Sequence, residues 1–359
     1  MTDLAALLRE LALPRPAGSV AQARVVETLK RELVARGFTV AEQRFTATPA
    51  GLDAVAVLGF VVAGMGAAVL TLGSGGTGLA SGRYVLLATS LAILALGTPL
   101  RRAMLGRARG RRVEAVNLIA TRGPAAPALW LAAHHDSKGQ VFSMASRLVW
   151  AGLAALGGGG LVALALAGEM GAAVPRGAWL GAAWPAFLGG APLMLNAVLR
   201  PSPGALDNGT GILAILAVLD RLAPQASVGV LLPDAEELGL VGARALVEER
   251  GALLRDAAVI NFDGIDDDGD VIALVHRPGS LTEAVAAALS ARRRRWLPVL
   301  VDGIVLGRAA RECVTLMRGG WGTMRVVHTR RDTADRLSLT GVRAVADGVA
   351  AVLNRAPAP

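Results

Sequence analysis

The sequence predicts an α/β fold, a mixed, mostly parallel sheet flanked by helices, plus four transmembrane helices inserted as two hairpins. In the polar parts of the chain, strand-like apolar runs alternate with segments of helical periodicity, which is typical of such a sheet. Four long runs without a charged residue interrupt this alternation. The 359 residues are 53% apolar and 18% charged, which excludes an intrinsically disordered chain.

The polar segments predict the individual elements of the sheet and its covering helices. Gly37 ends the first helical pattern as a C-terminal stop signal, and an alternating strand pattern follows it. We expect helices at 20–37, 212–222, 243–249 and 281–294. We expect strands at 38–46, 115–120, 128–133, 227–232, 257–262 and 271–276.

The four uncharged runs are each long enough to cross a bilayer, which takes about 17–25 residues. An alternative is that they are buried core helices. The runs pair into hairpins, whose turns we expect at 73–82 and 169–176. The runs cover residues 54–82, 84–100, 148–168 and 177–199, so we expect a lipid bilayer as a partner.

Each hairpin returns the chain to the side it left, so the remaining segments share one side of the membrane. The expected organisation is a domain built from 1–53, 101–147 and 200–359, with hairpins at 54–100 and 148–199. Arginines flank the spans on the domain side, while the hairpin tips carry only Arg83 and Arg176. The positive-inside rule therefore predicts a multi-pass cell-membrane protein with a cytoplasmic domain. The flanking residues are Arg101, Arg102, Arg107, Arg109, Arg111, Arg112 and Arg147.

Charge and cysteine content exclude two further classes of protein. The net charge is +9, but only 4% of the residues are aromatic and no basic-aromatic stretch forms a stacking surface. We therefore expect no nucleic-acid partner. The single cysteine, Cys313, excludes an intramolecular disulfide framework and a cysteine-based zinc site. Nothing in the sequence indicates an oligomeric state.

Two clusters follow predicted strands or lead into predicted helices on either side of the second hairpin. In His134-His135-Asp136, residues two apart share one face of an extended chain, so His134 can bind a metal while Asp136 orients it. The small residues around Asp207 allow a tight turn that brings a carboxylate close to an ion. The alternatives are an incidental histidine pair and a helix cap at Asn208 or Thr210.

Three further clusters lie later in the chain. Glu236 and Glu237 follow a predicted strand, where one can bind a cation while the other acts as a base, although a solvated acidic loop is the alternative. Asp263 ends a buried strand, which is where α/β sheets place site residues. His328 is a lone histidine whose role the residues themselves leave open.

The order His, Asp, Glu-Glu, Asp, His, with its glycine-rich turns, resembles the co-catalytic di-zinc aminopeptidase family. Its relatives include bacterial leucyl aminopeptidases, glutamate carboxypeptidases and glutaminyl cyclases. The resemblance covers 117–137 and 203–353 well and leaves out both hairpins. It implies a zinc-aminopeptidase-like sheet, two Zn²⁺ per chain and a peptide substrate with a free N-terminus. In the implied roles, Asp207 bridges both ions after a cis Asp207–Asn208 peptide, His134 and Asp263 complete one ion, Glu237 and His328 the other, Glu236 is the general base and Asp136 orients His134.

The chemistry of these ligands is consistent with that implication, because imidazole and carboxylate groups suit Zn²⁺. The expected function is therefore a membrane-anchored zinc aminopeptidase. Two alternatives stay open. His134-His135-Asp136-Ser137-Lys138 resembles glutaminyl cyclases, which bind one zinc ion and cyclise an N-terminal glutamine. An inactive receptor or scaffold can also share the fold.

Overall fold

The structure is a computed structural model that describes residues 3–47, 54–72, 84–87, 89–91, 112–123, 126–195, 201–223 and 226–355. The chain divides into two compact units. The first contains Met1–Pro49, Gly110–Gly139 and Arg200–Pro359, and the second contains Ala50–Arg109 and Gln140–Leu199. Each unit is described by itself below.

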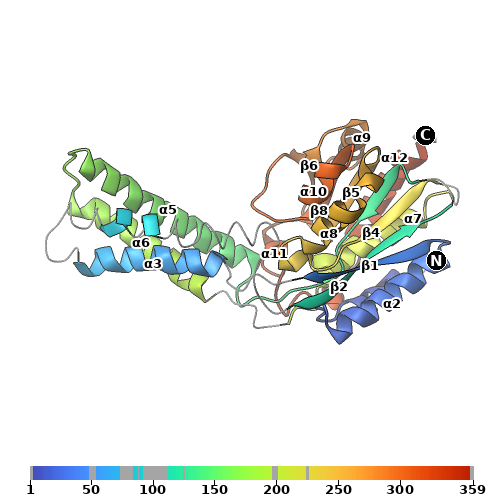
Figure 1. Cartoon of the computed structure of the whole chain (residues 1–359), viewed down its shortest axis with the longest axis horizontal. Coiled ribbons are helices and arrows are strands. Elements are labelled where there is room, and N and C mark those ends of the chain that lie inside the picture. The colour runs from blue at the N-terminus through green and yellow to red at the C-terminus, as the bar shows by residue number, and fades with distance from the viewer. Residues whose placement is uncertain are drawn as a thin grey trace. The chain divides into compact units, whose positions relative to one another are not determined.

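The first unit is built on one eight-stranded sheet in the order β1-β2-β4-β3-β5-β8-β6-β7 (Figure 1). Four of its seven neighbouring strand pairs are parallel, whereas β1–β2, β2–β4 and β6–β8 are antiparallel. The predicted mixed, mostly parallel sheet flanked by helices is therefore confirmed. The strands are β1 (Thr39–Ala47), β2 (Val113–Thr121), β3 (Leu129–Ala132), β4 (Val228–Leu232), β5 (Ala258–Ile265), β6 (Asp270–Arg277), β7 (Arg292–Arg294) and β8 (Glu312–Gly319).

The central strands are buried on both faces, which explains their continuous apolar sequences. Because successive side chains alternate between faces, Leu129 and Leu131 of β3 enter one core while Trp130 and Ala132 enter the other. Helices α1 (Leu4–Leu11), α2 (Val20–Ala35), α7 (Gly211–Leu219), α9 (Ser280–Ala288) and α12 (Thr340–Arg355) cover the first core. Helices α8 (Val241–Arg250) and α10 (Gly303–Ala309) cover the second.

The predicted helix 281–294 is wrong in its second half. Helix α9 ends at Ala288, Ser290 takes a left-handed conformation with φ 48°, and the chain then pairs as β7 along β6. All three arginines of β7 are exposed, so they keep water at the open edge of the sheet. No sequence signal ends the helix here, because arginine has good helix propensity and the helical pattern could continue through Arg292–Arg294.

The second unit contains helices α3 (Ala54–Leu72), α5 (Met144–Glu169) and α6 (Arg176–Met194). Glycines allow their backbones to approach closely. A methyl group added at Gly157 of α5 would lie 2.0 Å from the backbone nitrogen of Ala186 in α6. One added at Gly190 of α6 would lie 2.5 Å from the nitrogen of Ala63 in α3.

Among the described residues, α5 is the one helix that is long and apolar enough to cross a membrane. The apolar part of α3, Val55–Thr71, is shorter than this criterion requires. The prediction of four transmembrane helices is therefore not confirmed. Most of the predicted span 84–100, the turn 73–82, and all of the predicted flanking arginines except Arg112 and Arg147 lie outside the described residues.

Candidate active site

Three neighbouring parallel strands bring the acidic and histidine clusters to one edge of the sheet. His134 follows β3, Glu236 and Glu237 form the short helix η3 (Glu236–Leu238) after β4, and Asp263 lies near the carboxyl end of β5. Because β4, β3 and β5 are parallel neighbours, their carboxyl ends meet at the same place. All of these side chains are buried.

The two carboxylate oxygens of Asp207 face different histidines. Its Oδ1 lies 3.1 Å from His134 Nε2, and its Oδ2 lies 3.0 Å from His328 Nε2. His328 Nε2 also lies 2.9 Å from Glu237 Oε1. Asp207 therefore stands between two sets of donors, which is the geometry that a carboxylate shared by two ions requires.

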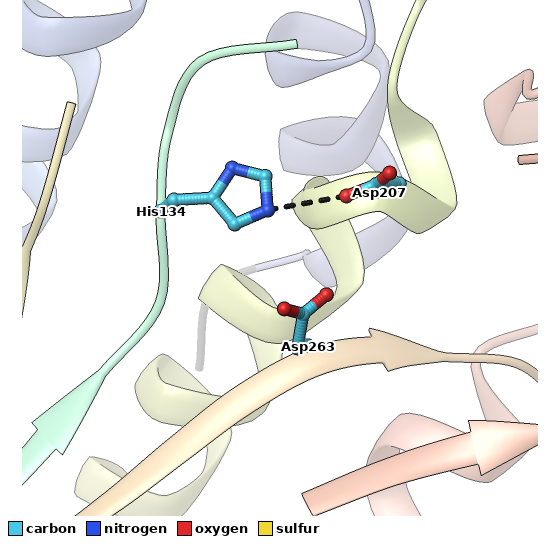
Figure 2. A group of neighbouring side chains, drawn as sticks. All are labelled: His134, Asp207 and Asp263. Atoms are coloured by element: carbon cyan, nitrogen blue, oxygen red, sulfur yellow. Dashed lines mark ion pairs between the residues drawn. The ribbon is translucent and has the colours of Figure 1, made fainter. Parts of the chain in front are cut away.

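The donor atoms form two overlapping groups that share Asp207. One consists of His134, Asp207 and Asp263, and the other of Asp207, Glu237 and His328. Within each group, the ligand atoms all lie within 4.8 Å of one another. Figure 2 shows the first group, in which His134 points at Asp207 and Asp263 rises from β5 toward both. The structure thus brings together all five residues expected to bind metal.

Asp136 connects the His134 segment to the Glu236–Glu237 turn. Its two oxygens accept hydrogen bonds from the backbone nitrogens of Glu236 and Glu237, at 3.1 and 3.2 Å. Its Oδ1 also lies 3.4 Å from His134 Nδ1. If the imidazole proton is on Nδ1, facing this carboxylate, the lone pair of Nε2 is available to bind a metal on the Asp207 side.

The turn that carries Asp207, η2 (Ala205–Thr210), is held from two directions. The Asn208 side chain donates to the carbonyl of Phe262 and accepts from the nitrogen of Gly264, so it is hydrogen-bonded to β5 on both sides of Asp263. The buried carboxylate of Asp332 accepts from the nitrogens of Leu206 and Asp207, at 2.6 and 3.2 Å. The Asp207–Asn208 peptide is cis, as the resemblance implied.

The site concentrates negative charge in a buried volume. Burial raises the pKa of Glu236 well above its usual value and that of Asp263 to about 8. Burial alone would raise the pKa of Glu237 too, but His328 and then Lys138 outweigh it and lower this pKa to about 2. Buried carboxylates that repel one another are costly unless cations lie among them.

The donor set fits divalent zinc. Imidazole nitrogens and carboxylate oxygens are common zinc ligands, and two histidines with three carboxylates supply them here. The buried Oε1 of Glu237 has no hydrogen-bond partner among the described residues, although His328 Nε2 is close by. The 2.9 Å between these two atoms suits two ligands of one ion.

Lys138 contacts the same ligand from the other side. Its Nζ lies 3.2 Å from Glu237 Oε2 and donates to the Glu237 carbonyl at 3.2 Å. The ammonium therefore occupies one carboxylate oxygen and leaves Oε1 on the side of His328. Lys138, the last residue of the motif that resembles glutaminyl cyclases, therefore holds the Glu237 carboxylate in place.

The sequence reasoning missed Asp302, which lies at the start of α10. Its side chain is buried, and neither carboxylate oxygen has a partner among the described residues. Burial raises its pKa to about 7, and the charges of His134 and Asp136 act on it. The available signal was an aspartate directly after the apolar run 299–301, the same signal that singled out Asp263.

Similarity to known proteins extends over most of the chain. In structure it is similar to an aminopeptidase from Aneurinibacillus sp. strain AM-1, with TM-score 0.55, 15% identity, and 99% of this chain and 93% of that chain covered. A glutaminyl cyclase from Fimbriiglobus ruber has TM-score 0.55, 14% identity and coverages of 99% and 94%. A zinc aminopeptidase from Bacillus subtilis has TM-score 0.55, 13% identity and coverages of 99% and 96%.

These likenesses concern the fold alone, because the identities are low. A search of curated protein sequences found no significant match. The model of peptidase family M28, however, matches residues 117–353, which include all the predicted site residues. The chain therefore belongs to peptidase family M28.

Proposed function

We propose that the protein is a membrane-anchored, zinc-dependent aminopeptidase that binds two Zn²⁺ ions. The observation that carries this proposal is the placement of Asp207, whose two oxygens face two separate donor groups. His134 and Asp263 would complete one ion, and Glu237 and His328 the other. Zinc bound there would polarise a scissile carbonyl and lower the pKa of a water molecule.

Glu236 is the general base in this proposal. It is buried beside both donor groups, and its environment disfavours the charged carboxylate, so it is suited to accept a proton. In the hydrolysis of an N-terminal peptide bond, Glu236 takes a proton from the attacking water and passes it to the leaving amine. Asp136 holds the backbone of Glu236 and so keeps this carboxylate at the reaction centre.

Peptides with a free N-terminus are the proposed substrates. Two zinc ions would offset the charge of the three ligand carboxylates, and a free substrate amine could then sit against one of the ions. Asp302 adds a buried carboxylate with no partner among the described residues. A positively charged substrate end suits such a site better than a negatively charged one.

Membrane anchoring by the second unit, with four helices in two hairpins, is the further part of the proposal. Helix α5 is long and apolar enough to span a bilayer. The helices expose large apolar side chains, among them Phe60, Leu156 and Trp184, and pack through glycines. We propose that the first unit lies on the cytoplasmic side, because arginines flank the spans there. A reporter fused after Pro359 tests this orientation, and a readout from outside the cytoplasm would contradict it.

A glutaminyl-cyclase-like reaction with one zinc ion is the second candidate. It is favoured by the contact between Lys138 and Glu237, since Lys138 belongs to the motif that resembles cyclases. The ammonium offsets part of the Glu237 charge, which lowers the attraction of that donor group for a second ion. The two candidates therefore differ in the number of ions bound.

Metal content per chain of the full-length, detergent-purified protein tests both candidates. Two zinc ions, with hydrolysis of aminoacyl-coumarin amides, are expected for the aminopeptidase. One zinc ion, with cyclisation of an N-terminal glutamine, would replace it by the cyclase. A protein that binds no zinc after chelator-free purification would overturn both and favour a scaffold.

Glu236→Gln tests the assignment of the base. We expect the variant to keep its zinc and its fold and to lose at least about 100-fold in kcat, within the range for general-base catalysis. Glu283→Gln, at an exposed position that pairs with Arg293, is the matched control and should keep full activity. Equal activities of the two variants would remove Glu236 from the mechanism.

A further inference from the structure

Arg15 is a fully buried arginine whose side chain bonds only to backbone carbonyls in the described structure. Its Nε donates to the His135 carbonyl at 2.8 Å, and its Nη2 donates to the Gly204 carbonyl at 2.9 Å. Its Nη1 donates to the carbonyls of Pro203 and Leu11, at 2.7 and 2.9 Å. A buried guanidinium is costly unless its donors are bonded, and these carbonyls supply the acceptors.

Two of these bonds reach the segments that carry metal ligands. His135 is next to His134, and Gly204 immediately precedes the turn that holds Asp207. The backbone of Arg15 joins the same connection, because its nitrogen donates to Ser137 Oγ and its carbonyl accepts from the Ser137 nitrogen, both at 3.1 Å. Ser137 Oγ in turn donates to the Ser202 carbonyl at 3.1 Å.

The two segments approach each other closely at this point. A methyl group added at Gly204 would lie 2.6 Å from Ser137 Cβ and 3.0 Å from Arg15 Nη1. Along the chain, however, the whole stretch Gln140–Leu199 of the second unit separates them. Closing so long a connection costs conformational entropy, and no local turn sets the distance between its ends.

The charge of Arg15 also acts on the site. The neighbouring carboxylates that favour its charged form are Asp332, Asp136, Asp207 and Glu237, in that order of strength. Within the described residues Arg15 forms no ion pair at hydrogen-bond distance, so its charge acts on several carboxylates instead of pairing with one.

We propose that Arg15 is a positioning residue for the metal site, which sets the separation between the segments that carry His134 and Asp207. It does so where no local turn joins the two segments, because Gln140–Leu199 lies between them along the chain. Lysine cannot fill this role, because its ammonium has three donors and no planar fork, whereas the guanidinium reaches carbonyls on both segments at once. The inference rests on the proposed function in that it treats these residues as zinc ligands.

Metal binding by full-length, detergent-purified Arg15→Lys tests the proposal. The protein is stripped with chelator and titrated with Co²⁺, and the visible absorption of the bound cobalt reports ligand geometry. We expect a changed cobalt spectrum, a zinc affinity about 10–100-fold lower, and a fall in kcat larger than the rise in KM. Arg36→Lys is the matched control, because Arg36 bonds Asp220 and the Glu32 carbonyl in the same unit without reaching a ligand segment.

A purely structural role would lower the melting temperature but leave the cobalt spectrum and zinc affinity of the folded fraction unchanged, and that result would overturn the proposal. If Arg15→Lys does not fold, Arg15→Gln decides. Its neutral amide buries no charge and has two donors, so it cannot reach all the carbonyls that the guanidinium binds, and wild-type zinc affinity in it would refute the proposal. A wild-type protein that takes up neither cobalt nor zinc would instead overturn the zinc-enzyme proposal itself.

Discussion

Replacing Asp136 by asparagine tests whether this carboxylate positions the metal ligands, because the change weakens its hydrogen bonds to the turn without removing a ligand. The two carboxylate oxygens of Asp136 accept the backbone N–H groups of Glu236 and Glu237. An asparagine of the same shape can accept only one of them. Its amide nitrogen would face the other N–H group, donor against donor, in a buried place.

The magnitude follows from these bonds. A buried N–H group left without an acceptor costs about 1–3 kcal/mol, so the unfolding free energy should fall by that amount. The turn that carries the base and one ligand also loses its fixed position. For a residue that supports metal ligands, the expected loss of zinc affinity is about 10–100-fold, which equals about 1.4–2.7 kcal/mol.

Zinc affinity and kcat of full-length Asp136→Asn, measured in detergent by competition with a chromophoric chelator, check this expectation. Asp267→Asn is the matched control. Asp267 also accepts several backbone N–H groups, from Ser338, Leu339 and Gly341, but belongs to the cap of α12. It should lose stability while its zinc affinity stays within about twofold of the wild type.

Two results would refute the reasoning. Wild-type zinc affinity in Asp136→Asn would mean that the contact with Glu236 and Glu237 does not hold the ligands in place. An equal loss of affinity in Asp267→Asn would mean that the effect comes from general destabilisation of the unit.

Three further predictions concern stability. Gly242→Ala should destabilise by about 1–3 kcal/mol in chemical unfolding, despite alanine's better helix propensity, because the added methyl would lie 2.0 Å from the Asp234 carbonyl oxygen, whereas Gly322→Ala meets nothing. Burial lowers the pKa of His276 to about 4, so the wild-type protein should lose stability as the pH falls from about 6.5 toward 4. A His276→Gln variant should lose less over that window in melting curves. Removing metal with a chelator should lower the melting temperature, and zinc should restore it, since an ion at 100 times its Kd stabilises by about 2.7 kcal/mol.

The location of the site could be predicted because it depends on a local pattern. His134, Glu237 and Asp263 follow apolar strands and Asp207 lies in a glycine-rich turn, patterns visible within ten residues, whereas the role of His328 came from the family resemblance. Parallel pairing then places strand ends together, so His134, Glu237 and Asp263 meet without further information. The failure at 281–294 has the opposite cause, because only pairing with β6 makes a strand of Arg292–Arg294.

Arg15 could not be found in this way. It lies between Pro14 and Pro16, where no helical or strand period exists. Its side-chain acceptors His135, Pro203 and Gly204 are 120, 188 and 189 residues away. Contacts at that separation produce no local sequence pattern. Nothing in the sequence distinguishes Arg15 from the other members of a set of 37 Lys and Arg residues.

The four spans are predicted because they contain no charged residue, but an uncharged segment is not always strongly apolar. The stretch 177–199 contains no charged residue, yet α6 is rich in glycine and alanine and includes Pro185 and Pro192. Small residues lower the apolarity of a helix, but they also let its backbone approach its neighbours, as Gly189 does at Ala154 of α5. In a bilayer, such close packing is a main source of attraction between helices. For three of the four proposed spans, the proposal therefore depends on α3, α5 and α6 acting as one bundle, in which α5 supplies the apolar length and α6 the close contacts.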